Sequence, residues 1–80
     1  MIVRIFTLKN GLEEYDDVQA IRIKSKDYNL LILKDYLPII GKIEGNLQVE
    51  ITEDDKVDFE DIVAYYINEK NIFNVMIEGK

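Results

Sequence analysis

Residues Leu30 to Ile51 read LLILKDYLPIIGKIEGNLQVEI and carry the clearest structural signals of the chain. The segment opens with four consecutive apolar residues, Leu30 to Leu33. Such a short continuous run predicts a strand that is buried on both faces, because it offers no polar side to water. Pro38 lacks a backbone donor and favours extended geometry in the residue before it, so we expect the strand to end before this point.

The remainder of this segment predicts a loop followed by a second strand. Residues 37 to 43 include four apolar side chains within the expected connection, which indicates a loop packed against the core. Gly41 and Gly45 would supply the backbone freedom that a compact loop requires. From Leu47 to Ile51, apolar and polar residues alternate, as is typical of a half-buried strand.

Working outward, other segments also have strand patterns. The clearest strands are Ile2 to Leu8, Val18 to Lys24 and Ile72 to Ile77, which are rich in β-branched and aromatic residues. Leu12 to Asp17 contains four acidic residues, which predicts a short edge strand or a loop. Thr52 to Lys56 is polar and predicts a solvated hairpin turn.

The segment from Val57 to Ile67 admits two interpretations. Its Val, Ile, Phe and Tyr content favours a strand, whereas the apolar spacing also fits a helix with an acidic cap. We therefore expect an all-β fold, a small antiparallel β-sandwich or flattened barrel, with residues 1–80 as a single domain. The alternative is an α+β fold with a helix at about residues 58–68.

Composition excludes several functional classes. The net charge is −6, from sixteen acidic and ten basic residues, so the chain lacks the basic surface that nucleic-acid binding requires. There is no cysteine and no histidine, which removes thiolate and imidazole ligands and the commonest general base. No apolar run is long enough to cross a bilayer, and no signal peptide is apparent. We expect a cytoplasmic protein.

The sequence also lacks a catalytic motif. The four glycines do not form a phosphate-binding loop, and Ser25 has no histidine to activate it. Glu13 and Glu14 are adjacent acids, but they are not expected to form a catalytic pair. Adjacent carboxylates in a turn point apart and stay solvated. We expect no enzymatic activity, no cofactor, no metal and no small-molecule substrate. An enzyme would instead need a concave pocket containing a carboxyl group with a strongly shifted pKa.

In the order of these signals the chain resembles the amino-terminal β-sandwich domain of the epsilon subunit of F-type ATP synthases. That family has a strand with valines, then a motif close to F-G-I-L-P-x-H-x-P-L, then a glycine and a further strand. The matching positions are Ile21 and Ile23 for the valines, Leu30 to Leu33 for F-G-I-L, Lys34 to Ile39 for P-x-H-x-P-L, and Gly45 for the later glycine. Asn71 to Ile77 is similar to the last strand of the family's sandwich.

The chain also departs from the family pattern. Leu31 replaces the glycine, Lys34 the first proline and Tyr36 the histidine, and a Ser-Gly-Gly sequence expected around Val63 to Tyr65 is missing. The carboxy-terminal helical hairpin that many members carry is not among these 80 residues. We therefore expect neither regulation nor ATP binding by such a hairpin.

The resemblance implies a structural role as a rotor-stalk subunit that couples the gamma subunit to the ring of c subunits, without chemistry of its own. It places the protein in the cytoplasm, at the membrane periphery through the complex. The implied partner contacts are Asn29, Lys34, Asp35, Tyr36 and Pro38. Because Asn29 and Tyr36 stand where the family has ionisable groups, hydrogen bonds rather than ion pairs are expected there. The alternative is a free-standing protein–protein interaction module of the same fold.

Overall fold

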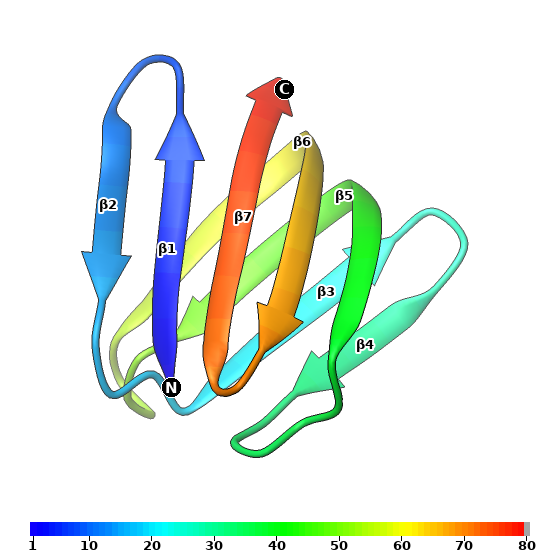
Figure 1. Cartoon of the computed structure of the whole chain (residues 1–80). Helices are drawn as coiled ribbons and strands as arrows, with labels where there is room; N and C mark the ends of the chain where they lie inside the picture. The colour runs from blue at the N-terminus through cyan, green and yellow to red at the C-terminus, as the bar shows by residue number, and fades with distance from the viewer. Residues whose placement is uncertain (80) are drawn as a thin grey trace.

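The computed structural model describes residues 1–79, and within them the chain forms seven strands and no helix (Figure 1). The strands are β1 (Ile2–Thr7), β2 (Gly11–Tyr15), β3 (Ala20–Ser25), β4 (Asn29–Ile32), β5 (Ile39–Glu50), β6 (Lys56–Glu69) and β7 (Ile72–Gly79). They pair in the order β2-β1-β7-β6-β5-β3-β4. All pairs are antiparallel except β1 with β7, which is parallel. The all-β prediction is confirmed, with a mixed rather than purely antiparallel sheet.

The long strands β5 and β6 bend, so that one continuous sheet folds into two layers (Figure 1). The front layer contains β2, β1 and β7 together with residues 62–69 of β6 and 39–45 of β5. The back layer contains β4 and β3 together with residues 47–50 of β5 and 56–59 of β6. Neither layer would be complete without its half of β5 and β6.

The bend lies at an irregularity in the pairing of β5 with β6. Register is lost between Gly45 and Leu47, as expected for a β-bulge, which increases the local twist of a strand. A side chain at Gly45 would collide with the carbonyl oxygen of Lys24, so this position requires glycine. The Asn46 side chain stabilises the opposite strand, because its Oδ1 accepts a hydrogen bond from the backbone N–H of Asp61 at 3.0 Å.

The inner faces of the two layers bury one hydrophobic core. Its members are Val3, Ile5, Val18, Ile21, Ile23, Ile32, Ile43, Leu47, Val49, Ile62, Ala64, Tyr66, Phe73 and Val75. Tyr66 stacks on Phe73 with ring centroids 5.4 Å apart. Burial of this apolar surface is the main term that favours the fold.

Strand β6 settles the alternative between strand and helix. It runs from Lys56 to Glu69 through the whole region where a helix at about residues 58–68 was considered. Its inward positions alternate with period two from Ile62 to Asn68, and Tyr66 is buried while its neighbour Tyr65 is exposed. The strand interpretation is confirmed. Alternate side chains of β6 pack into the core between the two layers, which a strand allows.

The prediction that Leu30 to Leu33 are buried on both faces is wrong. Strand β4 contains most of this run, but it lies at the end of the sheet and pairs only with β3. Ile32 is fully buried, whereas Leu31 and Leu33 are 41% and 49% exposed. An apolar run predicts a strand, but it does not indicate how many neighbours the strand has.

The prediction of a packed loop over residues 37–43 is also wrong. Strand β5 already begins at Ile39, and two of the apolar residues, Leu37 and Ile40, are 74% and 77% exposed. Gly41 lies within the strand rather than in a turn. Its missing side chain leaves room for the Tyr66 ring, which a Cβ atom at this position would overlap.

Candidate partner-binding surfaces

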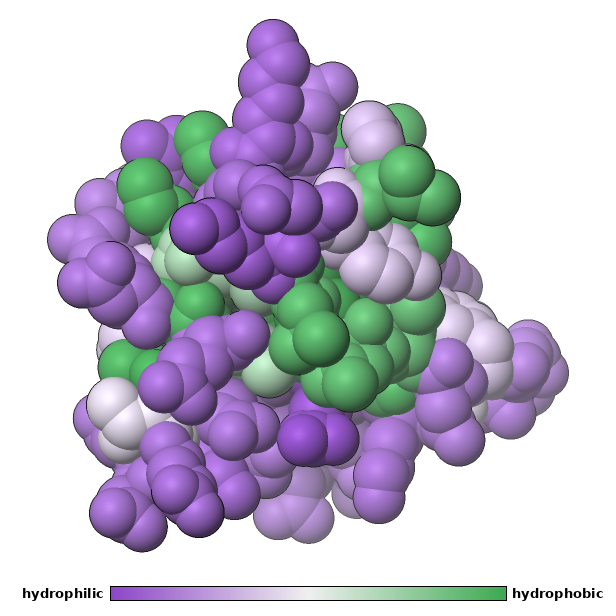
Figure 2. All heavy atoms as spheres, turned by 90° about the horizontal axis from the view of Figure 1, so that it is seen from below, coloured by the Kyte–Doolittle hydropathy of each residue, from purple (hydrophilic) through white to green (hydrophobic). Residues whose placement is uncertain are grey.

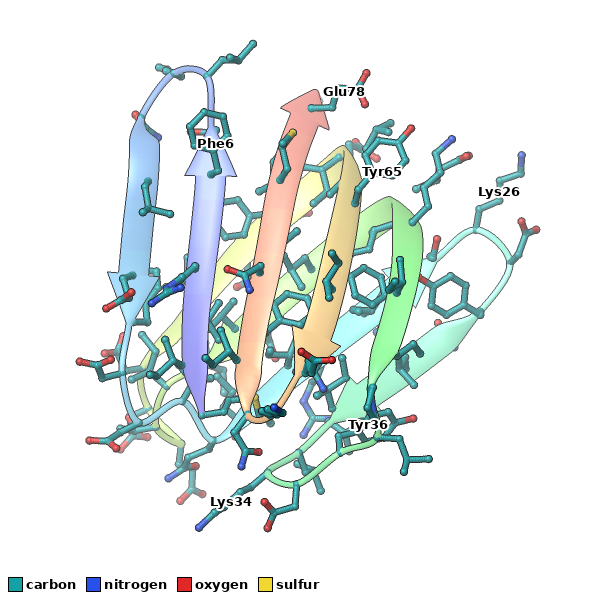
Figure 3. The ribbon with its side chains drawn as sticks, in the orientation of Figure 1. Phe6, Lys26, Lys34, Tyr36, Tyr65 and Glu78 are labelled. Atoms are coloured by element: carbon teal, nitrogen blue, oxygen red, sulfur yellow. The ribbon has the colours of Figure 1, made fainter. Side chains whose placement is uncertain are left out.

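The predicted contact residues from Lys34 to Pro38 lie on one loop, residues 33–38, which we call the lower loop. It connects β4 to β5 at the lower end of the molecule, where Figure 3 shows Lys34 and Tyr36. Asp35 adopts a left-handed backbone conformation, with φ of 63°. Its N–H donates to Asn71 Oδ1 at 2.6 Å, and Asn71 Nδ2 donates to Asp35 Oδ1 at 2.9 Å. The turn between β6 and β7 therefore holds the lower loop at its tip.

Further contacts attach the lower loop to the body of the sandwich. The N–H of Tyr36 donates to the Leu33 carbonyl oxygen at 3.2 Å, and the half-buried Tyr36 ring packs against the core. Buried Asn68 donates from Nδ2 to the Leu37 carbonyl oxygen at 3.5 Å. The loop is thus fixed to the sandwich at several points, with Lys34 and Leu37 facing solvent.

Viewed from below, this end of the molecule shows a hydrophobic area surrounded by hydrophilic residues (Figure 2). The lower loop itself has two exposed apolar side chains, Leu33 and Leu37. The lower end therefore combines an apolar centre with charged side chains such as Lys34 and Asp35.

Asn29 lies apart from the other predicted contact residues. It begins β4 and is paired with Lys24, whereas the lower loop follows the other end of this strand. Three residue steps along a strand correspond to about 10 Å. The structure therefore brings together the residues from Lys34 to Pro38 but separates Asn29 from them.

A second surface, which the sequence analysis missed, is the outer side of the front layer. The strand registers align four exposed apolar residues in a row across four adjacent strands: Leu12, Phe6, Met76 and Tyr65. With neighbouring strands about 4.8 Å apart, this row is about 14 Å long. Lys42 of β5 continues the row, and its ammonium group lies 5.7 Å from the centre of the Tyr65 ring.

The neighbouring row of the same surface is half apolar. It runs through Glu14, Arg4, Asn74, Ile67 and Ile40 on the same five strands. Arg4 Nε donates to Glu14 Oε2 at 2.8 Å, while Ile67 and Ile40 extend the apolar surface from Tyr65. We call the six exposed apolar residues Phe6, Leu12, Ile40, Tyr65, Ile67 and Met76 the front face. They line an open groove of about 390 Å³.

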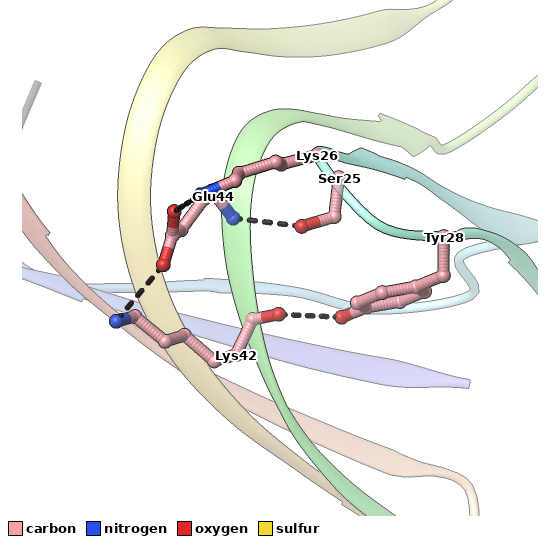
Figure 4. Close-up of polar contacts among 5 residues, drawn as sticks. All are labelled: Ser25, Lys26, Tyr28, Lys42 and Glu44. Atoms are coloured by element: carbon pink, nitrogen blue, oxygen red, sulfur yellow. Dashed lines mark hydrogen bonds and ion pairs between the residues drawn. The ribbon is translucent and has the colours of Figure 1, made fainter.

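The front face ends at an exposed ion pair on β5. Lys42 Nζ lies 3.0 Å from Glu44 Oε1, and Lys26 Nζ lies 3.9 Å from Glu44 Oε2 (Figure 4). The bond to Lys42 holds the pKa of Glu44 below its ordinary value, and the same bond raises the pKa of Lys42. Both groups therefore stay charged near neutral pH.

The edge of β5 beside this ion pair is covered by the turn between β3 and β4 (Figure 4). The Tyr28 hydroxyl donates to the Lys42 carbonyl oxygen at 2.6 Å, and the N–H of Glu44 donates to Ser25 Oγ at 2.9 Å. The Tyr28 and Tyr66 hydroxyls are 3.0 Å apart, and burial raises the pKa of Tyr66. These contacts close the side of the sandwich between the two layers.

Comparison with known proteins shows a likeness in fold but none in sequence. No family model matches the chain, and no curated protein sequence matches it. A chain from the cryo-EM structure of the Tetrahymena thermophila mitochondrial ATP synthase central stalk and c-ring superposes with a TM-score of 0.78. The two chains share a fold. Their sequence identity is 16%, and the match covers 98% of our chain but 63% of the Tetrahymena chain. This chain thus spans less than two thirds of the length of its structural neighbour.

Two further observations describe the chemistry of residues 1–79. They contain no cluster of three or more His, Cys, Asp or Glu side chains that could hold a metal ion. In the same part of the chain we find no helical segment with the length and apolar character needed to cross a bilayer.

Proposed function

We propose that this protein is a non-catalytic rotor-stalk subunit of the epsilon type in an F-type ATP synthase. The observation that supports this most strongly is the likeness in fold to a chain of an ATP synthase central stalk and c-ring structure over 98% of the present chain. The family resemblance of residues 21–49 points independently to the same assembly. In this proposal residues 1–80 act as a single β-sandwich domain, located in the cytoplasm at the membrane periphery through the complex.

The two surfaces would serve two partners. We assign the front face to a gamma-type subunit, because an apolar surface of six side chains on five strands resembles the centre of a stable protein interface. We assign Lys34, Asp35, Tyr36 and Pro38, with Asn29 at the far end of β4, to the c-ring. A subunit that contacts both can transmit rotation only if it is rigid, and the continuous sheet provides that rigidity.

A co-purification experiment tests the proposal. Affinity-tagged protein, expressed in the native cell, is expected to capture a gamma-type subunit and c subunits together. Met76→Glu places a charge in the middle of the front face and is expected to reduce capture at least about tenfold, the equivalent of about 1.4 kcal/mol. Leu8→Glu is the matched control, because Leu8 is 88% exposed on the turn between β1 and β2 and lies outside the front face. Capture of no ATP synthase subunit by the unmodified protein would refute the proposal.

The second candidate is a free-standing interaction module that uses the same front face. The substitutions at Leu31, Lys34 and Tyr36 and the absence of a matching family model favour it. A gene outside any ATP synthase operon, together with capture of a different protein that Met76→Glu abolishes, would support this candidate over the rotor-stalk subunit.

A further inference from the structure

The two strands at the ends of the sheet differ in how they are protected from pairing with other chains. Strand β2 carries Glu13 and Glu14, and two more acids follow it. Strand β4 has no charged residue between Asn29 and Ile32. Charged side chains are a common means of preventing an edge strand from pairing with another chain. By this criterion the charges on β2 prevent it from pairing with another chain, whereas β4 has no such charges.

The register shows which backbone groups of β4 are available. The N–H of Ser25 donates to the Tyr28 carbonyl oxygen at 2.8 Å, so this pair closes the β3–β4 turn. Because hydrogen-bonded and non-hydrogen-bonded pairs alternate along an antiparallel ladder, Leu30 and Ile32 bond to β3. Asn29 and Leu31 therefore direct their N–H and C=O groups away from β3. Within residues 1–79 no backbone group pairs with them there.

The charges around β4 indicate which kind of strand would bind. Residues 20–34 carry four basic residues and one acidic residue. Glu50 pairs with Arg22 and Glu44 with Lys26, so within residues 1–79 Lys24 and Lys34 supply the unpaired positive charge beside β4. Within the described part of the chain, Lys24 and Lys34 take part in no ion pair. These two lysines therefore attract an acidic segment and oppose a second copy of the same hairpin.

We propose that the outer edge of β4 binds an extended, acidic segment of a partner protein as an added β-strand. Main-chain hydrogen bonds from Asn29 and Leu31 supply the affinity, and the basic hairpin selects the acidic sequence. The exposed Leu31 and Leu33 side chains offer apolar contacts beside the new strand. This inference does not depend on the rotor-stalk proposal, because it rests on backbone groups and charge at one edge.

Two designed peptides test the proposal. The capped peptides Thr-Glu-Val-Glu-Val-Glu-Thr and Thr-Lys-Val-Lys-Val-Lys-Thr have similar strand propensity and opposite charge. The acidic peptide is expected to shift the amide resonances of Asn29 and Leu31 in ¹⁵N-labelled protein and to slow their hydrogen exchange. The basic peptide is expected to bind at least about tenfold more weakly, and salt is expected to weaken the acidic peptide's binding. Equal binding of the two peptides, or shifts confined to β2 or the front face, would overturn the proposal.

Variants separate the backbone contribution from the charge contribution. Leu31→Pro removes an outward N–H without removing a bond to β3 and is expected to weaken binding of the acidic peptide about tenfold. Leu31→Thr loses the apolar contact but keeps the N–H, so it should weaken binding clearly less than Leu31→Pro. Should Leu31→Pro not fold, the double variant Lys24→Glu and Lys34→Glu provides the test, since it should reverse the preference between the peptides. Met76→Glu, which tests the rotor-stalk proposal, should leave peptide binding unchanged. Dimerisation of the unmodified protein through β4, seen by sedimentation, would contradict the choice of partner.

Discussion

The two outer faces of the sandwich differ in chemistry although β5 and β6 cross both layers. The outer side of the back layer is mostly polar, with Leu31 as its exposed apolar residue. There Gln48 Nε2 donates to Asp58 Oδ1 at 2.8 Å, and Arg22 Nε donates to Glu50 Oε2 at 3.4 Å. The outer side of the front layer carries the six apolar residues of the front face. Since both layers already bury their inner faces in one core, the fold does not require the front face to be apolar. This supports the proposal that the front face binds a partner.

The largest expected effect distinguishes the inner from the outer side of a single strand. On β7, Phe73 points into the core and is fully buried, whereas Met76 points outward. Phe73→Ala should lower the free energy of unfolding by about 3–5 kcal/mol through cavity formation, and Met76→Ala by about 0.5 kcal/mol or less. Urea unfolding measures both. If Met76→Ala lowers the free energy of unfolding nearly as much as Phe73→Ala, the front face stabilises the fold. That result would contradict the distinction between the core and the front face.

A smaller effect concerns the pH dependence of stability at the buried Tyr66 hydroxyl, which contacts Tyr28. Burial raises the pKa of Tyr66 above its ordinary value of 10.0, and the hydrogen bond with Tyr28 acts in the same direction. Above pH 10.0 the unfolded chain releases this proton while the folded protein retains it, so the free energy of unfolding should fall as pH rises, by up to about 1.4 kcal/mol per pH unit.

The variant Tyr66→Phe isolates this contribution. It should be less stable than the unmodified protein near neutral pH, by about 1 kcal/mol for the lost hydrogen bond, and should lose less stability above pH 10.0. Part of the alkaline loss should remain, because burial and Glu13 raise the pKa of Tyr15 as well. If urea unfolding gives the same dependence of stability on alkaline pH for the variant and the unmodified protein, the pKa of Tyr66 is not raised by folding.

The smallest effect is expected at the border of the front face. Lys42 lowers the pKa of Glu44 below its ordinary value of 4.5, so the pair stabilises the folded state above pH 4.5, and this contribution is lost as pH falls through the lowered pKa. Glu44→Gln should therefore unfold at slightly lower urea concentration at neutral pH, and the difference should disappear in acid. A difference that persists in acid would assign the effect to packing of the side chain rather than to its charge.

The positions of the strands could be predicted from the sequence because β-branched and aromatic residues cluster between turns. The order in which the strands pair could not be predicted. The four apolar residues Leu30 to Leu33 would look the same in a central strand and in the edge strand that they largely form. The sequence predicts a packed loop at Ile40 because no local signal marks the start of β5 at Ile39. That start depends on pairing with the distant residue Asn68.

The family resemblance predicts the lower loop as a contact surface, and its residues from Lys34 to Pro38 lie together. Nothing in the local sequence indicated that Asn71 would fix the loop at Asp35, because the two residues are 36 positions apart. The front face was missed although a signal was present. Tyr65, Ile67 and Met76 interrupt the expected alternation with apolar residues at outward positions. Such continuous apolar runs in strands of a small domain indicate either a second buried face or a binding surface.

The most direct test of the central claim is the heat capacity change when the protein binds a purified gamma-type subunit, measured by calorimetry at several temperatures. If the front face is the buried surface, the change should be clearly negative for the unmodified protein and for Leu8→Glu, and binding should be lost or the change reduced for Met76→Glu. A heat capacity change near zero, or one that Met76→Glu leaves unaltered, would contradict the claim that the front face is the binding surface.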